Sequence, residues 1–188
     1  SYVYAPQQNL FQYCFSLNVD LFSGYFMTPH NFNGSGNVDY ALNRSFCGGM
    51  YENVYLHIFN NTRRLIASCD EQGLTDYAGM MRVVQAYAVQ MLTDVYGPVA
   101  YTSCIEDPTN GASLSYDRQQ SIDNSIFELL DKALQDFRSP KSTLEERQSF
   151  DYWCNGDLDM WIQVANQLKR RAALRIVKVD PTLAKQKA

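Results

Sequence analysis

Apolar residues recur at spacings of three and four along much of the chain, which is the pattern of helices with one buried face. The clearest case is the segment Trp161–Ile176. Asp180-Pro181 follows it, and because proline disfavours a helical residue before it but fits a first helical turn, this dipeptide predicts the end of one helix and the start of another. The apolar stripe expected along this segment is Trp161, Ala165, Leu168, Ala172, Ile176 and Val179.

The same spacing predicts four more helices. Gly97-Pro98 and Ser139-Pro140 mark the ends of two of them. Asp117 and Gln120 have the spacing of a capping box, which predicts that a helix starts at Asp117. These helices are expected at residues 8 to about 21, at 51–69, at 75–96 and between Asp117 and Ser139.

No segment predicts a strand, so the fold class is expected to be all-α, a helical bundle or solenoid. The helices at 51–69 and 75–96 are separated only by Asp70-Glu-Gln-Gly73 and therefore form an antiparallel hairpin. Long loops are expected at residues 24–49, 100–116 and 142–157. Loops as long as the first are usually functional or disordered, and its aromatic content argues against disorder.

Composition narrows the function classes. The apolar fraction of 46% can build a core, whereas a net charge of −4 and a pI near 5.1 argue against a nucleic-acid partner, which requires a basic stripe. Thirteen tyrosines and ten phenylalanines form a large aromatic content. Such rings fill a helical core or, where they are exposed, stack on the faces of sugars.

No catalytic or metal-binding pattern is present. The two histidines, His30 and His57, lie far apart, and the five cysteines contain no C-x-x-C pair, so they are expected to be mainly small buried side chains. Motifs of zinc proteases, serine hydrolases and phosphate-binding loops are missing. We therefore expect no catalytic residues, no metal, no cofactor and no enzymatic activity. A glycoside hydrolase fragment is the remaining enzymatic alternative, and it requires two carboxylates about 5–10 Å apart across a cleft.

The loop at residues 24–49 is the candidate for ligand contact. Sugar recognition combines flat apolar faces with planar side chains that bond hydroxyls, and this loop supplies both. The alternative is that its rings anchor the loop onto the helices beneath. The ligand-binding residues expected here are Tyr25, Phe32, Tyr40, Asn43, Arg44 and Phe46.

Two further groups have alternative interpretations. Tyr152 and Trp153 lie beside the turn dipeptide Asn155-Gly156, which would allow at least one ring to be exposed, but burial against the next helix is the favoured interpretation. A cationic cluster either attracts an anionic partner or pairs with acids of neighbouring helices, where exposed pairs contribute little stability. This cluster is Arg170, Arg171 and Arg175.

Two segments resemble the signatures of the SusD/RagB family of outer-membrane nutrient-binding lipoproteins. One is Trp161 followed by Ala-Asn-x-Leu-Lys-x-Arg-x-Ala-x-Arg-Ile and then Asp180-Pro181. The other is Gln85-Ala-Tyr-x-x-Gln-Met-Leu-Thr-Asp-x-Tyr-Gly-Pro-Val-Ala-Tyr101. It departs from the family in one respect, since Pro98 directly follows Gly97 where the usual pattern is Gly-x-Ile/Val-Pro.

The resemblance implies a scaffold of TPR-like helical hairpins and a single domain over residues 1–188, the N-terminal portion of a longer protein. It further implies a non-enzymatic cell-surface lipoprotein of the outer membrane. Such a protein holds an oligosaccharide or another nutrient for a SusC-like TonB-dependent transporter, without a nucleic-acid partner. Its membrane attachment is through a lipid on a cysteine upstream of Ser1. The alternative from another class is a helical-repeat scaffold whose partner is only protein.

Overall fold

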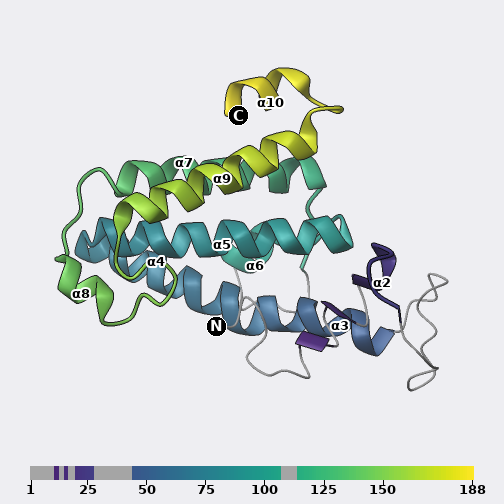
Figure 1. Cartoon of the computed structure of the whole chain (residues 1–188), viewed down its shortest axis with the longest axis horizontal. Coiled ribbons are helices and arrows are strands. Elements are labelled where there is room, and N and C mark those ends of the chain that lie inside the picture. The colour runs from purple at the N-terminus through teal and green to yellow at the C-terminus, as the bar shows by residue number, and fades with distance from the viewer. Residues whose placement is uncertain (1–10, 13–14, 17–19, 28–43, 107–113) are drawn as a thin grey trace. The chain divides into compact units, whose positions relative to one another are not determined.

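The computed structural model describes residues 11–12, 15–16, 20–27, 44–106 and 114–188, without the side chains of Phe22 and residues 44–47. The chain forms two compact units, residues 1–58 and 59–188 (Figure 1). Among the described residues no strand occurs, and the one isolated β-bridge joins Val99 to Asp117. The all-α fold class is therefore confirmed.

In the first unit the described residues are mainly helical. Phe11 and Phe15 lie in the segment predicted as a helix, and their rings stack with 5.0 Å between centroids. Helix α2 (Asp20–Phe22) follows, and α3 (Arg44–Asn53) runs into a π-helical turn, η4 (Val54–Phe59), whose last residue belongs to the second unit. Among the residues of this unit whose side chains are described, the buried apolar ones are Leu21, Met50, Val54 and Ile58.

The predicted loop at residues 24–49 is wrong at its C-terminal end, because α3 begins at Arg44. The helix therefore contains Gly48 and Gly49. A glycine inside a helix costs only about 1 kcal/mol, and the burial of Met50 one position later offsets that cost. The helix predicted at residues 51–69 consequently starts earlier than its apolar pattern indicates.

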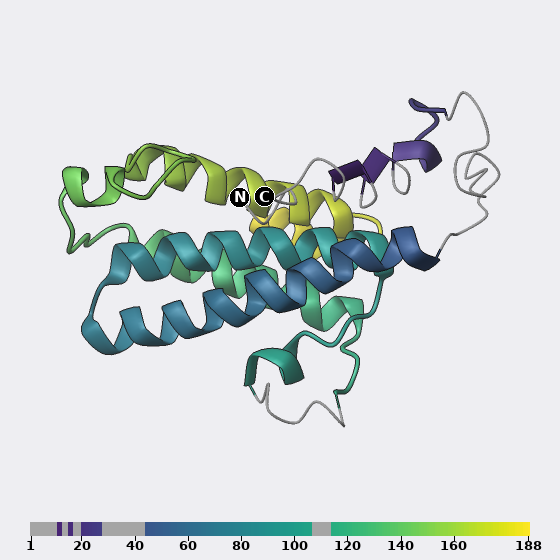
Figure 2. The ribbon, with the colours of Figure 1, turned by 90° about the horizontal axis from the view of Figure 1, so that it is seen from below.

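The second unit is built around α5 (Thr75–Tyr96), as Figures 1 and 2 show. Helices α4 (Asn60–Gln72), α7 (Gln119–Asp136) and α9 (Leu158–Ile176) pack against it. Fourteen of the 22 residues of α5 are buried, so this helix is enclosed on several sides. Helices α4 and α5 form the predicted antiparallel hairpin, and Gly73 makes the turn with φ 69°.

The predicted apolar stripe along α9 is confirmed over most of its length. Trp161, Ala165, Ala172 and Ile176 are buried. Val179, by contrast, is 83% exposed, because α9 ends at Ile176 and the stripe ends with it.

Helix α10 (Pro181–Lys187) begins where Asp180-Pro181 predicts a helix start. The Asp180 carboxylate accepts the Leu183 N–H at 2.9 Å. Asp131 of α7 pairs with Lys169 of α9 and Lys187 of α10, each at 2.6 Å, and the Lys187 ammonium lies 5.7 Å from the Phe127 ring centre. One carboxylate of α7 thus connects the last two helices.

Two short helices lie inside predicted loops: α6 (Thr102–Glu106) and α8 (Leu144–Gln148). The capping box predicted at Asp117 is wrong, because α7 has Arg118 at its N-cap with no side-chain bond. The Asp117 carboxylate instead accepts the N–H groups of Tyr101 and Thr102 at 2.8 and 2.7 Å. The capping box that does form is Thr143 with Glu146, at the start of α8.

Candidate ligand-binding site

The structure describes part of the predicted site. Tyr25 is 89% exposed, and Phe26 and Met27 beside it are also exposed. Phe32, Tyr40 and Asn43 lie outside the described residues. Arg44 and Phe46 were expected in a loop but lie in the first turn of α3.

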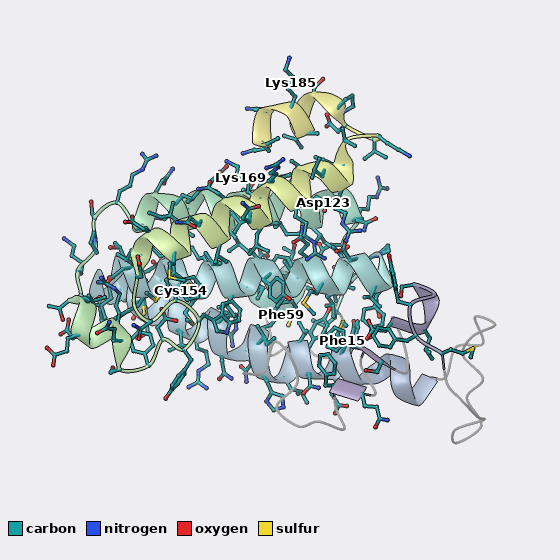
Figure 3. All side chains as sticks on the ribbon, in the orientation of Figure 1. Phe15, Phe59, Asp123, Cys154, Lys169 and Lys185 are labelled. Carbon is teal, nitrogen blue, oxygen red and sulfur yellow. The ribbon has the colours of Figure 1, made fainter. Side chains whose placement is uncertain are left out.

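A second group of exposed rings lies in the loop between α8 and α9, which also contains Cys154 (Figure 3). Phe150, Tyr152 and Trp153 are 44%, 94% and 37% exposed. The favoured interpretation, burial of both rings beside the Asn155-Gly156 turn, is therefore wrong for Tyr152, and Trp153 is only partly covered. Phe150 contacts Tyr77 of α5 edge to face, with 5.3 Å between ring centroids. This loop therefore places aromatic rings at the surface of the second unit.

Trp153 lies against Trp161, which is 3% exposed and therefore a core residue. The two rings stack with centroids 5.7 Å apart and planes 17° apart, and Tyr87 of α5 approaches Trp153 edge-on at 6.2 Å. Stacked and edge-to-face pairs at these separations are attractive beyond the area they bury. The orientation of the Trp153 ring is thus fixed by rings on two helices.

One buried carboxylate, Asp151, organises this loop. Burial alone would raise its pKa, but the hydrogen bonds it accepts lower the pKa below the ordinary value. Four fixed donors around one carboxylate make a stiff turn, since all are lost together if the turn opens. The donors are Trp161 Nε1 at 2.7 Å and the backbone N–H groups of Gly156, Trp153 and Cys154 at 2.9, 3.0 and 3.2 Å.

Two further buried charges, Asp76 and Arg147, attach the loop to the start of α5. Arg147 donates to the carbonyls of Gly156 and Ser142 at 2.7 Å each and lies 3.5 Å from the Asp76 carboxylate. Asp76 also accepts the N–H groups of Lys141 and Ser142 and the Ser142 hydroxyl. Burial favours a raised pKa for Asp76, yet these bonds together lower it.

Gly156 is required by the shape of the turn. Its φ is +77°, a left-handed conformation that side chains disfavour, and a Cβ there would come within 2.9 Å of the Gln148 backbone nitrogen. The Asn155-Gly156 pair was predicted as a turn, but its contact with α8 has no signal in the sequence.

A cavity of about 480 Å³ lies beside this loop, between α8 and the start of α9. Most of its lining is polar, from Arg147, Gln148, Asn155, Asp157 and Asp159, with Leu144 and Leu158 completing it. Asp157 also caps α9 by accepting the N–H groups of Asp159 and Met160 at 2.8 and 3.3 Å. Polar groups and exposed rings are therefore neighbours along the same stretch of chain.

Another cavity, of about 270 Å³, lies among α5, α6 and α7. Arg82, in its wall, pairs with Asp136 at 2.5 Å and with Asp70. Burial raises the pKa of Tyr101, also in the wall, to about 12, and its hydroxyl accepts a bond from Gln85 at 2.8 Å. Arg82 and Tyr101 are thus both engaged in bonds within the protein. The carboxylates that line this cavity are Glu106 and Glu128.

The cationic cluster of α9 pairs internally. Arg171 and Arg175 bond Asp94 of α5 at 3.3 and 2.8 Å, which is the second interpretation of this cluster. Asp123 of α7 lies close enough to Asp94 to be affected by its charge. Burial, together with this negative charge, raises the pKa of Asp123 to about 6. Among the residues that the structure describes, no group of three or more His, Cys, Asp or Glu side chains is placed to hold a metal ion.

The family model of the Susd and RagB outer membrane lipoproteins matches residues 1–188. The chain belongs to the SusD-like family. No curated protein matches it, but solved structures do. A chitin-binding SusD homolog from Flavobacterium johnsoniae is 28% identical with a TM-score of 0.87, over 99% of this chain and 39% of its own.

Two other SusD-like structures agree. A SusD-like protein from Bacteroides thetaiotaomicron is 26% identical with a TM-score of 0.82, over 99% of this chain and 38% of its own. A SusD homolog from Bacteroides vulgatus is 28% identical with a TM-score of 0.77, over 95% and 36%. The chain thus spans less than two-fifths of these SusD-like relatives, and its hairpins are the TPR-like hairpins of the family.

Proposed function

We propose that this SusD-like chain is part of a non-enzymatic cell-surface protein that binds oligosaccharides. The observation that carries the proposal is the likeness to a chitin-binding SusD homolog over 99% of the chain with a TM-score of 0.87. Exposed aromatic rings on both units agree with it, because flat apolar ring faces are what sugar rings stack on. In this proposal the ligand is held and released without any bond being made or broken.

The proposal extends to the place and the partner of the protein. The family consists of outer-membrane lipoproteins, and within the described residues no helix is both long enough and apolar enough to cross a membrane. We place the protein at the outer face of the outer membrane, held by a lipid upstream of Ser1. It passes its ligand to a SusC-like TonB-dependent transporter. That residues 1–188 form one domain at the N-terminal end of a longer protein stays a prediction.

The segment around Tyr25 is the proposed contact of the first unit with the ligand. Tyr25, Phe26 and Met27 expose three consecutive large apolar side chains, and such groups on a folded surface usually mark an interaction site. The remaining predicted contacts, Phe32, Tyr40, Asn43, Arg44 and Phe46, are proposed to complete this surface.

Isothermal titration calorimetry with chitohexaose and maltohexaose tests the proposal, comparing wild type with Tyr25→Ala, Tyr40→Ala and Phe46→Ala. We expect each change to weaken binding about three- to tenfold, the range for losing one stacked ring. Tyr116→Ala is the matched control, since Tyr116 is an exposed tyrosine of the other unit at 66%. Circular dichroism checks the fold. Wild type that releases no heat with either glycan would contradict the proposal.

A protein-only scaffold is the second candidate, favoured by one observation. Leu174, Val177 and Val179 at the end of α9 are 61%, 47% and 83% exposed, an apolar surface suited to a partner protein. In this case Leu174→Glu would abolish complex formation with that partner, whereas chitohexaose would release no heat with any variant.

A further inference from the structure

We propose that the α8–α9 loop carries a second sugar-binding surface, formed by Tyr152 and Trp153 with the polar side chains of the adjoining cavity. This inference rests on the proposed function. It concerns residues that lie outside the segment 24–49 and on a different unit.

The Trp153 ring is packed against other rings and is still partly exposed. Trp161 stacks against this ring with centroids 5.7 Å and planes 17° apart, and Tyr87 approaches it at 6.2 Å, yet 37% of Trp153 is exposed. Part of the indole is therefore open to a ligand while the rest is held by other rings. A flat ring backed by a parallel ring is a platform on which the apolar face of a sugar can stack without a change in the protein.

The backbone that carries Tyr152 and Trp153 is held in place by hydrogen bonds. The backbone from residue 151 to residue 156 is fixed by the four hydrogen bonds to Asp151 and by the Arg147 bond to the Gly156 carbonyl. Binding a ligand costs less when the contacting groups are ordered beforehand. Tyr152 is 94% exposed and therefore contributes little to packing. The ordered loop holds this ring in contact with water, where a ligand can reach it.

The lining of the adjoining cavity indicates the class of ligand. Gln148, Asn155 and Asp159 line the adjoining cavity of about 480 Å³ with amide and carboxylate groups, which bond hydroxyl and N-acetyl groups. Asp157 and Asp159 make the local charge negative, and the Arg147 guanidinium is already paired with Asp76. We therefore assign a neutral oligosaccharide to this surface, because an anionic one would be repelled.

The two tryptophans of this chain supply a specific readout. Both belong to this surface, Trp153 as platform and Trp161 as its backing ring, and the segment 24–49 contains none. Tryptophan emission is therefore expected to report a ligand on the α8–α9 loop. Chitohexaose is expected to produce a saturable change in emission, and an anionic oligogalacturonate none.

The variant that carries the test is Tyr152→Ala, because a ring that is 94% exposed is removed without loss of packing. We expect it to shift the midpoint of the emission titration about three- to tenfold toward higher chitohexaose concentration. Trp153→Phe should remove most of the amplitude. Tyr116→Ala is the control, because this exposed tyrosine belongs to neither proposed surface, and it should retain the wild-type midpoint.

The outcomes separate this inference from the proposed function. Calorimetric binding of chitohexaose with no change in tryptophan emission would overturn the second surface and leave the proposed function standing. Neither heat nor emission change with wild type, using chitohexaose and maltohexaose, would overturn both. An emission change with a tryptophan-free peptide but not with either glycan would show a peptide-docking surface and contradict the inference.

Discussion

The two ends of α5 hold carboxylates in opposite ways. At the N-terminal end, Asp76 is fully buried and surrounded by donors whose positions the backbone fixes, and its pKa is lowered. At the C-terminal end, burial raises the pKa of Asp94 although Arg171 and Arg175 reach it. Their side chains are 46% and 52% exposed. The difference agrees with the rule that hydrogen bonds from fixed donors stabilise an ionised carboxylate more than half-exposed cations do.

Removing each carboxylate in turn tests the difference between the two ends of α5 and should give the largest effect. Asp76→Ala leaves the buried Arg147 without its partner and should lower the free energy of unfolding by about 3–5 kcal/mol. Asp94→Ala should lower it by less than about 1 kcal/mol, because its two arginines can be solvated. Urea unfolding followed by circular dichroism measures both. Equal losses at the two ends would contradict the comparison.

A glycine substitution probes how tightly the loop is held at the N-terminal end. Gly156→Ala should cost about 2–3 kcal/mol, since it adds a close contact with the Gln148 nitrogen to an unfavourable φ. Gly73→Ala is the matched control, with a similar φ of +69° but open space around it, and should cost about 1 kcal/mol. The same urea experiment applies. A loss for Gly156→Ala no greater than for Gly73→Ala would show that the turn can shift.

Acid should weaken the N-terminal end of α5. The pKa values of Asp76 and Asp151 are lowered in the folded state, so their stabilisation is present above about pH 4, where the unfolded carboxyls ionise. It is lost as the pH falls through the folded values. Thermal unfolding between pH 2 and pH 5, about this window, measures the loss. Asp76→Asn should show a shallower decline than wild type.

The smallest effect is expected at the C-terminal end and has the opposite sign. The pKa of Asp123 is raised to about 6, so the folded state binds a proton more tightly than the unfolded state and stability falls as the pH rises from about 4 to 6. Asp123→Asn should therefore stabilise the protein at neutral pH, by about 1 kcal/mol or less after solvent screening. The gain should vanish near pH 4, about the unfolded pKa. A destabilised variant at neutral pH would show that the carboxylate is needed.

The long helices of the fold could be predicted because their apolar residues repeat over several turns. Helix α5 matches its predicted bounds, residues 75–96, and α9 differs from its prediction mainly at its ends. Helices α6 and α8 have five residues each, too few for a period to be recognised. Similar capping patterns occur at Asp117 and Thr143, and only the tertiary contacts decide that the first carboxylate binds the start of α6 instead.

The candidate surfaces were predictable only in part. The Asn155-Gly156 turn could be predicted from its dipeptide, but the exposure of Tyr152 beside it could not be decided, since an aromatic residue next to a helix is as readily buried. The buried network could not, because Asp76 and Arg147 are 71 positions apart and each has many possible partners in the sequence. Trp153 illustrates the same limit, since its use as a platform depends on how Trp161 and Tyr87 are placed by two other helices.

Helix α10 depends on a single carboxylate for its ionic attachment. Asp131 bonds Lys187 of this helix and Lys169 of α9, and these pairs are partly exposed, so dissolved salt weakens them. We therefore expect helix α10 to detach as a unit while α5 and α7 stay folded. Its amide protons should exchange with deuterated solvent ahead of those in α9, and faster still as the ionic strength rises.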